Sequence, residues 1–572
     1  MNRFRAVLLC SALLAPCAGY AQTTAPFPAP QPIDAYIRSS WNSLTRSMSE
    51  CHSLVDSKVK AAPVLYLPKD LPIPKDVAAL PAACGVRVER LPVRIRHIGQ
   101  IRRGEIPEPG LLYLPHPYVV PGGRFNEMYG WDSYFIILGL LRDGRVDLAR
   151  GMVDNFFFEI ERYGGILNAN RTYYFTRSQP PFLSSMVLAV YKAEAARANT
   201  PQDRLRLRAW LRRAYRYETR DHSLWTSPIH RAGNTGLARY YDLGEGPVPD
   251  LTDDSTYYPD LIRWLLQHPK QDPGYLVTLP DHPTPSEKAK VAALSCDVTI
   301  SVVCAHAHVD GHWLTRDFYK GDRAVRESGF DTSFRFGPFS GSTHHFAGVD
   351  LNSLLYKYEL DMAREAKLLG KSSEAAQWKN EAAARRAAIN RYLWNPKLGL
   401  YMDYDFMKRR PSTYVYATTF YPLWAGAASP AQASAVEKNL KLFEHPGGLA
   451  MSTYDSGMQW DLPFGWAPVT WLTIDGLHKA GDDTDAARLA REFSRTIEAN
   501  YARDGTIVEK YNVVTRSSQV QVTAGYKQNQ IGFGWTNGVY LKMRQLLATT
   551  PAPAAQPAAF AAQDAGRPSA QD

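Results

Sequence analysis

Stretches of apolar residues at helical spacing recur along roughly 400 residues of this chain, without a regular alternation of strands and helices. One stretch covers 145–163, where the apolar residues share one helix face and Gly164 and Gly165 end the pattern. The same spacing predicts helices over 181–198, 202–217, 258–266, 351–369, 373–392, 431–442, 468–480, 484–501 and 538–547. Because alternating strands are scarce, the sequence favours an all-α domain in which helix pairs pack around a common centre.

The first 21 residues have the layout of a secretory signal. Arg3 and Arg5 precede an apolar run, and small residues at Gly19 and Ala21 fit cleavage after Ala21. We therefore expect a periplasmic or secreted protein. No segment reaches the roughly 18 to 20 apolar residues of a spanning helix, so no membrane span is expected. A lipoprotein box ending at Cys17 is a weaker alternative, because a proline precedes the cysteine.

The rest of the chain divides into three parts. Residues 22–75 are rich in proline and predict an arm that lies over the main domain. Residues 76–549 hold most of the helical stripes and form that domain. Residues 550–572 are rich in alanine, proline and glutamine, a composition typical of a disordered tail.

The charge of the chain argues against one class of partner. Lysine and arginine total 66 against 56 aspartate and glutamate residues, a net charge of +10. These basic residues are scattered, and the sequence has no compact basic run with interleaved aromatic residues. A nucleic-acid partner is therefore not expected.

Four cysteines follow the predicted signal: Cys51, Cys84, Cys296 and Cys304. An even number of cysteines in an exported chain is consistent with two disulfides. The local pairs, Cys51 with Cys84 and Cys296 with Cys304, close the shortest loops of the three possible connectivities. Four free buried thiols are the alternative, and the sequence leaves both open.

The segment CAHAHVDGHW at 304–313 contains His306, His308 and His312. Histidines at alternate strand positions can bind a metal, but no further ligands stand at a matched spacing, so no metal is expected. The motifs GxSxG, the P-loop and the dinucleotide GxGxxG are also absent from the sequence. Acyl, phosphoryl and hydride transfer therefore lack support, and no cofactor is expected.

Two irregular segments carry more functional groups than a helix or strand requires: PGGRFNEMYGWDSYF at 121–135 and QWDLPFGWAP at 459–468. Gly122 and Gly123 break regular structure, while Trp131 supplies a flat apolar face. Glycine, arginine, carboxylates and indole rings within so few residues are typical of a pocket wall.

Two acidic residues stand in similar surroundings. Asp331, in ESGFDTSFRFG, follows a turn flanked by glycine and precedes Arg335; Glu509, in IVEKYN, is followed by Lys510 and Tyr511. A carboxylate beside a cation is more often a structural ion pair than a catalytic group. Their residue types alone leave the role of both carboxylates open.

The two irregular segments resemble the signature segments of the inverting trehalases, glycoside hydrolases that split α,α-trehalose into two glucose molecules. The chain resembles the periplasmic type of this family. Similar blocks follow in the same order as in the family: NANRTYYFTRSQPPF, ESGFDTSFRF, VDLNSLLY, VEKYN and GFGWTNGVYLKM. Together they cover roughly residues 112 to 543, and each long block is too irregular for chance agreement.

The resemblance implies an (α/α)6 toroid with a sugar pocket at one end of the inner helix ring, so that 76–549 is a catalytic domain. The general acid of the family falls on Asp331 and its general base on Glu509, which inversion would hold about 6.5 to 9.5 Å apart. A disaccharide is the partner implied, and a monomer is expected. Sugar-binding positions fall on Arg124, Trp131, Asp132, Asn168, Arg177, Ser178, Gln179 and Gly329. Gln459, Trp460 and Asp461 are expected to support the pocket.

Some residues depart from the family pattern. The segment 239–254, RYYDLGEGPVPDLTDD, has no arginine where the family has an Arg-Pro-Glu element, so one sugar clamp is missing or relocated. Tyr526 and Ile531 stand where glutamate and aspartate are usual, and Phe330 replaces a tryptophan. Two alternatives therefore stay open: a hydrolase of another α-glucoside on the same fold, and a sugar-binding or sensing protein with weak catalysis.

Overall fold

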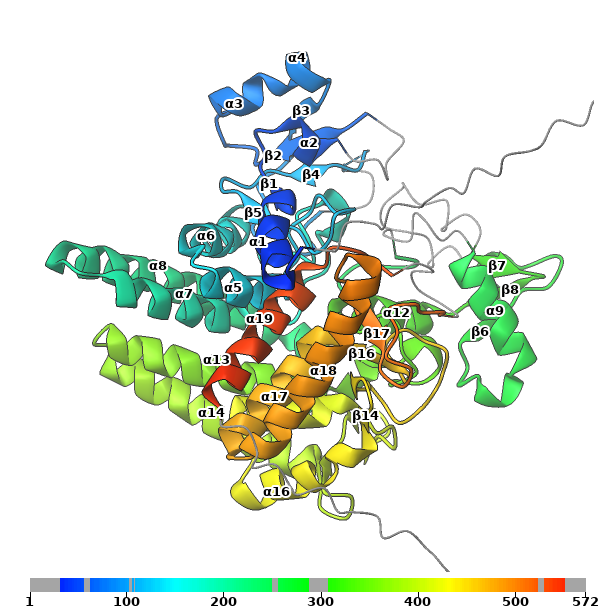
Figure 1. Cartoon of the computed structure of the whole chain (residues 1–572). Coiled ribbons are helices and arrows are strands. Elements are labelled where there is room, and N and C mark those ends of the chain that lie inside the picture. Colours follow the sequence, from blue (N-terminus) through cyan, green and yellow to red (C-terminus); the bar gives the residue numbers. More distant parts are fainter. Residues whose placement is uncertain are drawn as a thin grey trace, which may run out of the picture.

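The structure, a computed structural model, describes residues 31–55, 62–101, 105–106, 108–248, 256–287, 307–522 and 529–550. Helices dominate it (Figure 1). Several predictions concern residues outside these ranges: the signal at 1–21, the tail from residue 551, and Cys296, Cys304, His306 and Tyr526.

Among the described residues, six helices form a closed inner ring, in which each packs against the next and the last returns to the first. In ring order these are α5 (Asp132–Arg142), α7 (Leu183–Arg197), α13 (Val349–Leu368), α15 (Tyr421–Ala425), α17 (Ala467–Ala480) and α19 (Gly534–Thr549). The ring closes tightly where α5 meets α19. A Cβ at Gly538 would lie 2.1 Å from the carbonyl oxygen of Phe135, and a Cβ at Gly139 would lie 2.6 Å from Cα of Gly538. Glycine at both positions therefore permits this close backbone approach.

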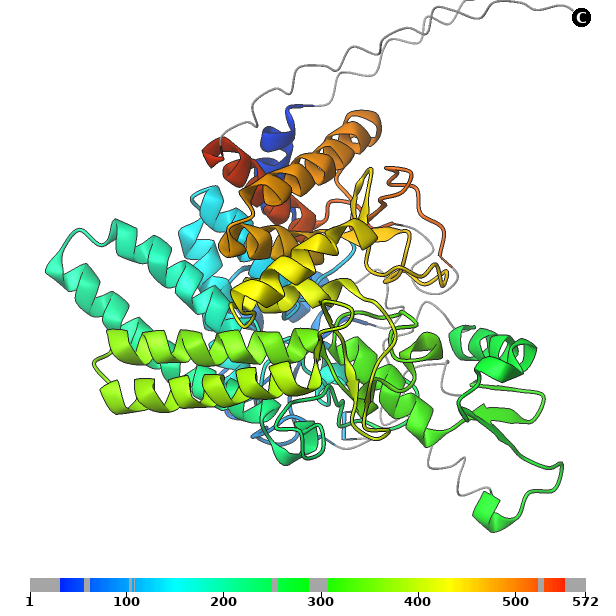
Figure 2. The same ribbon diagram turned by 90° about the horizontal axis from the view of Figure 1, so that it is seen from below.

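A second layer of helices covers the ring from outside. It consists of α6 (Val146–Arg162) on α5 and α7, α8 (Pro201–Trp225) on α7 and α13, α14 (Ser372–Tyr392) on α13, α16 (Pro430–Lys438) on α17, α18 (Asp483–Asp504) on α17 and α19, and α1 (Ile33–Ser43) on α19. Figure 2 shows α7 and α8 beside α13 and α14 as two long antiparallel pairs. The predicted all-α (α/α)6 toroid is confirmed.

Burial explains the difference between the two layers. The inner helices α5 and α17 bury residues on almost every side, whereas the outer helices α6 and α18 bury one face. Local signals set the helix starts as well. The side-chain oxygen of Thr200 accepts a hydrogen bond from N of Asp203, and the Asp203 carboxylate accepts one from N of Thr200, which together cap α8.

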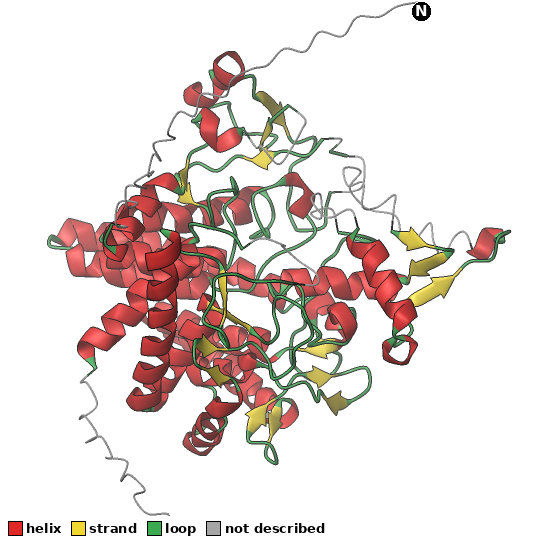
Figure 3. Cartoon of the chain, turned by 45° about the vertical axis from the view of Figure 1, so that its right-hand side comes forward, coloured by secondary structure: helices red, strands yellow, loops and turns green. Residues whose placement is uncertain are grey.

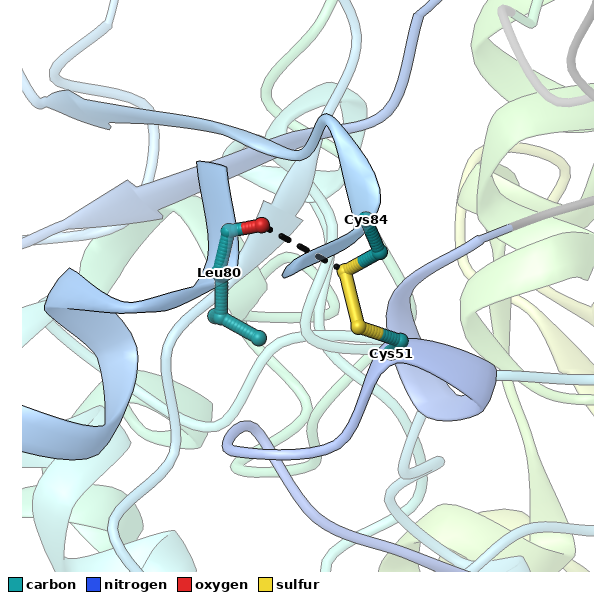
Figure 4. Close-up of a disulfide and its surroundings, with 3 residues drawn as sticks. All are labelled: Cys51, Leu80 and Cys84. Atoms are coloured by element: carbon teal, nitrogen blue, oxygen red, sulfur yellow. Dashed lines mark hydrogen bonds between the residues drawn. A yellow bond between two sulfur atoms is a disulfide. The ribbon is translucent and has the colours of Figure 1, made fainter. Parts of the chain in front are cut away.

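The N-terminal segment contributes more than an arm. It supplies α1 to the outer layer and then a small parallel sheet in the order β3 (Arg87–Arg90), β2 (Val64–Leu67), β4 (Leu111–Leu112). Beside this sheet lie α2 (Cys51–Leu54), α3 (Lys75–Ala78) and α4 (Leu80–Cys84). A disulfide joins Cys51 to Cys84 next to Leu80, with their Cα atoms 5.9 Å apart (Figure 4). This confirms one of the two predicted pairs; the domain boundary at residue 75 stays a prediction.

A lobe projects from the toroid at the right of Figure 1. It comprises α9 (Tyr257–Gln267) and an antiparallel sheet of β6 (Leu276–Thr278), β8 (His312–Leu314) and β7 (His308–Val309), and it continues into α12 (Arg316–Glu327). Its apolar residues form a separate cluster that includes Tyr258, Leu261 and Phe318. The lobe therefore has its own small core.

The other strands are short and lie with the loops, opposite most of the helices (Figure 3). They pair as β1 (Thr45–Arg46) with β5 (Tyr118–Val119), β10 (Trp394–Asn395) with β11 (Leu400–Tyr401), β14 (Glu444–His445) with β15 (Gly448–Leu449), β16 (Phe464–Trp466) with β17 (Lys510–Asn512), and β9 (Phe346–Ala347) and β13 (Arg410–Pro411) on either side of β12 (Tyr404–Asp405). No helix within the described ranges has the length and apolar character needed to span a bilayer.

Candidate active site

One pocket opens where several inner helices begin. Asp132 is the first residue of α5 and Trp535 the second of α19, and both line it. Six chain segments supply the lining residues: Pro121, Phe125, Tyr129, Trp131, Asp132, Asn168, Tyr174, Arg177, Gln179, Arg326, Gly329, Asp331, Gln459, Trp460, Trp466, Glu509, Phe533 and Trp535.

Most of the predicted site residues meet in this pocket. Both carboxylates, Asp331 and Glu509, line it, and so do eight other predicted residues: Trp131, Asp132, Asn168, Arg177, Gln179, Gly329, Gln459 and Trp460. Three predicted residues do not line it: Arg124, Ser178 and Asp461. Segments separated by up to several hundred residues thus converge on one site, as the resemblance implies.

A tight turn positions Asp331 after the end of α12. Gly329 has φ of 76°, and a Cβ there would lie 2.8 Å from the indole of Trp131, so glycine fits this position on both counts. Nη1 of Arg326 lies 3.5 Å from Oδ2 of Asp331, whose side chain is 35% exposed. The carboxylate therefore faces the pocket with a guanidinium beside it.

The segment 459–461 holds the loop that carries Asp331. Nε2 of Gln459 donates to the carbonyl oxygen of Asp331, and N of Trp460 donates to O of Thr332 at 3.2 Å. The buried carboxylate of Asp461 accepts a hydrogen bond from N of Phe334 at 2.8 Å, and burial raises its pKa to about 6. The contacts of all three residues are those of supports for the loop of Asp331.

Glu509 also lines the pocket and is almost fully buried. It immediately precedes β17, which pairs with β16 so that Lys510 lies opposite Trp466. Nζ of Lys510 donates to Oε2 of Glu509 at 2.9 Å, and the lysine side chain is fully buried. Nε1 of Trp535 donates to the carbonyl oxygen of Glu509 at 3.2 Å. Side chain and backbone of Glu509 are therefore both held in place.

Asp132 is a third carboxyl group in the pocket. Burial raises its pKa well above the usual range, and the negative charges of Glu509 and Asp331 raise it further. Its electrostatic interaction with both residues shows that the three carboxyl groups share one site. Such a group favours the protonated form and can donate a hydrogen bond.

The aromatic residues form a packed cluster behind the polar groups. Trp131 is 2% exposed and makes edge-to-face contacts with Phe330 and Trp535, both at 5.6 Å between ring centroids. Trp460 stacks on Trp466 at 3.7 Å. Little of the Trp131 face is open, so this ring both fills the core and lines the pocket. Phe330, which replaces a usual tryptophan, stays within the cluster.

The segment 168–179 also contributes polar groups to the pocket. Oε1 of Gln179 accepts a hydrogen bond from N of Trp131 at 2.9 Å. Nδ2 of Asn168 donates to O of Ser178 at 3.3 Å and to O of Arg326 at 3.4 Å. Arg177 is 2% exposed, and its guanidinium lies 4.9 Å from the ring centre of Tyr174. These contacts connect the segment 168–179 to the segment that carries Trp131 and to α12.

Arg326 is the main polar residue that the sequence interpretation missed. It stands five positions before Asp331, on α12, a helix that the pattern of apolar residues did not predict. Its guanidinium lines the pocket and also lies 3.4 Å from Asp322. Its spacing of five residues from Asp331 could have indicated it, because a side chain in the last turn of a helix lies near the loop that follows the helix.

Two other departures from the family pattern do not line the pocket as far as the structure describes them. In the segment 239–248 the carboxylate of Asp242 pairs with Arg323 at 3.1 Å, and carbonyl groups of this segment accept further hydrogen bonds from the Arg323 guanidinium. Asp242 also lies 3.9 Å from Nη1 of the pocket residue Arg177. Ile531 is 61% exposed and does not line the pocket.

The two described histidines of the segment 304–313 make local contacts. His308 stacks on Trp313 with ring centroids 4.5 Å apart, and Nδ1 of His312 lies 2.9 Å from O of Asp310. Two groups of metal-ligating residues do occur elsewhere within the described residues: Asp317 with His344 and His345, and His222 with Glu359 and Glu381. Neither group lines the pocket.

Comparison with known proteins identifies the family. A profile of the trehalase family matches residues 88–275 and 314–548. The cytosolic neutral trehalase of Saccharomyces cerevisiae is 35% identical over 557 residues, which cover 88% of this chain and 69% of that protein. The enzyme of the same name from Beauveria bassiana is 37% identical over 75% of this chain and 58% of its own length. The solved neutral trehalase of Saccharomyces cerevisiae aligns with a TM-score of 0.70, 33% identity, and coverage of 90% of this chain and 94% of that chain.

The helix toroid and its carboxylate-lined pocket, taken with these matches, define a glycoside hydrolase. The chain belongs to the trehalase family. The predicted location is wrong, however, because the relatives are named as cytosolic enzymes, whereas we expected a periplasmic or secreted protein. The relatives likewise give no support to a secretory signal at residues 1–21.

Proposed function

We propose that the chain hydrolyses α,α-trehalose to two glucose molecules with inversion at the anomeric carbon, with Asp331 as general acid and Glu509 as general base. The observation that supports this most directly is the arrangement of the pocket. Carboxylates of two residues far apart in the sequence line one cavity, together with an arginine beside the first and a lysine on the second. Inverting glycoside hydrolysis requires one acid and one base on opposite sides of the scissile bond.

Asp331 protonates the glycosidic oxygen as the bond to the anomeric carbon breaks, in the same step in which water attacks. The partly exposed carboxyl group has access to the pocket. Its carboxylate forms as the proton leaves, and the Arg326 guanidinium 3.5 Å away stabilises that negative charge. The leaving glucose therefore departs as a neutral alcohol.

Glu509 removes a proton from the attacking water. Lys510 occupies Oε2, so Oε1 is the oxygen that accepts this proton. Water attacks the face of the anomeric carbon opposite the leaving group, which inverts its configuration. The predicted separation of about 6.5 to 9.5 Å between the two carboxyl groups leaves room for this water and stays a prediction.

The polar residues of the pocket walls then hold the two sugar rings. Arg177, Arg326 and Gln179 offer donors to sugar hydroxyl groups, and Asp132, protonated through its raised pKa, offers another. Arg124 and Ser178 are not among the lining residues, and their contact with the sugar stays a prediction.

Glucose release from trehalose by the purified chain tests the substrate, with maltose and other disaccharides alongside. Asp331→Asn and Glu509→Gln should each lower kcat by about 10²–10⁴-fold, the usual contribution of a general acid or base. Asp260→Asn, at an exposed carboxylate of the lobe, is the matched control and should keep wild-type activity. Wild-type rates in either pocket variant would remove that residue from the mechanism.

Proton NMR of the first products tests the stereochemistry. Inversion of α,α-trehalose releases equal amounts of α- and β-glucose, because one ring inverts and the other leaves unchanged. Release of α-glucose alone would mean retention. Faster cleavage of another α-glucoside, or tight trehalose binding without turnover, would favour one of the two alternative functions.

A further inference from the structure

A cluster of metal-ligating residues lies outside the pocket, where α12 meets the short helix η5 (Thr343–His345). Asp317 stands in the first turn of α12, and His344 and His345 end η5. Oδ1 of Asp317 lies 3.0 Å from Nε2 of His344 and 3.2 Å from Nε2 of His345. Two consecutive imidazoles therefore direct the same ring nitrogen toward one carboxylate oxygen.

These distances are close to those of a metal centre. Zinc is bound by histidine nitrogen and carboxylate oxygen at about 2.0–2.2 Å in a tetrahedral site, so two ligands of one ion lie roughly 3.3 to 3.6 Å apart. The two distances to Asp317 are slightly shorter than this, and all three ligand atoms lie within 4.8 Å of one another. A small rotation of the imidazoles would place the three atoms around one ion.

One side of the cluster is buried and the other is open to solvent. The side chain of His344 is 6% exposed, that of His345 24% and that of Asp317 55%. An ion can therefore reach the ligand atoms from solvent.

Neighbouring residues fix the backbone of the cluster. Nη1 of Arg239 donates to the carbonyl oxygen of His344 at 2.9 Å, and this guanidinium lies over the ring of Tyr241 at 4.4 Å. The rings of His344 and His345 lie 3.9 Å apart, so their orientations are coupled. The ligands are thus held before any ion binds, which lowers the entropic cost of binding.

The other candidate group in the described residues fits a metal less well. In it, Oε1 of Glu359 already accepts hydrogen bonds from Nε and Nη2 of Arg385, at 2.8 and 2.6 Å. Arg385 already supplies the positive charge that an ion would bring. To bind a metal, Oε1 of Glu359 would have to give up its hydrogen bonds to Arg385. The carboxylate of Asp317, by contrast, is 55% exposed and contacts His344 and His345, so this cluster is the better candidate.

We propose that Asp317, His344 and His345 bind one divalent transition-metal ion of the zinc class, with water completing its coordination. Two imidazoles and one carboxylate favour such ions over Mg²⁺ and Ca²⁺, which prefer oxygen ligands alone. The ion joins the start of α12 to η5. Since α12 carries Arg326 and leads to Asp331, occupancy stabilises the helix that supports one pocket wall. This site does not depend on the function proposed above.

Titration calorimetry with ZnCl₂ on the full chain, free of any affinity tag, tests the proposal. Wild type should bind one equivalent of Zn²⁺ with saturation, and its thermal midpoint should rise with Zn²⁺ concentration because only the folded state holds the site. Asp317→Asn and His345→Ala change the two more exposed ligands and should still fold. Each should weaken binding by at least about tenfold, as loss of residues around metals commonly does.

His478→Ala is the matched control. His478 also pairs with an aspartate, Asp483, at 2.5 Å on the surface, but the pair has no third ligand in the described structure. This variant should bind Zn²⁺ as wild type does. Absence of saturable binding in wild type, or wild-type affinity in either Asp317→Asn or His345→Ala, would overturn the proposal. Co²⁺ absorption without a thiolate charge-transfer band would support nitrogen and oxygen ligation, while such a band would assign the ion to cysteine and contradict it.

Discussion

Nζ of Lys510 lies 2.9 Å from Oε2 of Glu509, and neither side chain is open to bulk solvent. The two residues are neighbours in sequence, yet they are not a surface ion pair. Lys510 also lies 4.9 Å from the ring centre of Trp466, a residue of the opposite strand β16. The ammonium therefore holds one carboxylate oxygen of the proposed base in place through a charge-assisted hydrogen bond.

Lys510→Met should lower kcat for trehalose. Without the lysine, Oε2 of Glu509 loses its charge-assisted hydrogen bond in a buried site, so the proposed base is no longer held in one position. Loss of one hydrogen bond to a charged group corresponds to a fall in kcat of roughly tenfold to a hundredfold. Initial rates of trehalose hydrolysis measure the effect.

A surface lysine supplies the control for this variant. Lys371 pairs with Glu374 at 2.9 Å where both side chains are about two-fifths exposed, and Lys371→Met should leave kcat unchanged. Circular dichroism checks that both variants fold. Wild-type kcat in a folded Lys510→Met variant would show that Lys510 does not position Glu509.

Gly329→Ala should destabilise the chain and reduce turnover. Alanine at a φ of 76° is strained by about 1 kcal/mol or more, and its Cβ would lie 2.8 Å from the indole of Trp131. Because Asp331 follows two residues later, any relief of this contact moves the acid. Urea unfolding and kcat measure the two effects.

Gly505→Ala separates strain from contact. Gly505 has φ of 66°, but a Cβ there would meet nothing within 4 Å. This variant should lose about 1 kcal/mol of unfolding free energy through the backbone alone and keep its kcat. Equal losses of stability and equal kcat in the two variants would show that the contact with Trp131 has no role.

The sequence predicted the outer helices of the toroid better than the inner ones. The stripe at 145–163 corresponds to α6, Val146–Arg162, because an outer helix has one apolar and one polar face. The inner helix α5 was not predicted as a helix. Because its residues are buried on almost every side, they form no one-sided apolar pattern, and the sequence was interpreted as an irregular pocket wall.

The helix α12 was missed for a different reason. Its sequence, RDFYKGDRAVRE, is highly charged, yet ten of its residues are buried, since ion pairs and hydrogen bonds within the fold satisfy the charges. Arg323, for example, is 1% exposed and pairs with Asp242. Such partners are distant in sequence and cannot be read from periodicity. Arg326 was not predicted as a site residue, because the helix that carries it was not predicted.

The pocket residues that were predicted came from irregular motifs, which depend little on periodicity. Asp331 and Glu509 were found through blocks of sequence, and the structure brings both to one cavity. The contact between Lys510 and Glu509 could not be predicted in the same way. Adjacent residues in an extended segment usually point to opposite sides. Here the side chain of Lys510, buried in β17 opposite Trp466, nevertheless reaches the carboxylate of Glu509.

Arg326→Gln should both lower kcat and raise KM for trehalose, so that kcat/KM falls by a larger factor than KM rises. The arginine contacts Asp331 and lines the pocket, so it acts both on the charge of the acid and on the bound sugar. Removal of one charge-assisted hydrogen bond corresponds to roughly tenfold to a hundredfold. Arg263→Gln, at an exposed ion pair of the lobe, is the control and should leave both constants unchanged. Unchanged kcat in Arg326→Gln would restrict this residue to binding.

Glu218→Gln should stabilise the chain at alkaline pH. Glu218, on α8, is fully buried beside Glu365 of α13, and burial raises its pKa to about 8, with Asp361 and Asp221 raising it further. Between its ordinary pKa near 4.5 and about 8, the folded state holds a proton that the unfolded state releases. The free energy of unfolding of wild type should therefore fall as pH rises through this window, by up to about 1.4 kcal/mol per pH unit.

Glutamine is neutral at every pH, so Glu218→Gln removes the part of this dependence that comes from Glu218, while the raised pKa of the buried Glu365 keeps its own part. Urea unfolding should show a free energy of unfolding on the order of 2–4 kcal/mol above that of wild type at pH 8, and little difference near pH 4.5. Glu161→Gln removes a carboxylate that is 39% exposed in a surface pair with Arg220, and it should change stability by less than about 1 kcal/mol. A wild-type stability that stays level between pH 4.5 and 8 would mean that Glu218 is ionised in the folded chain, with a cation or water satisfying it.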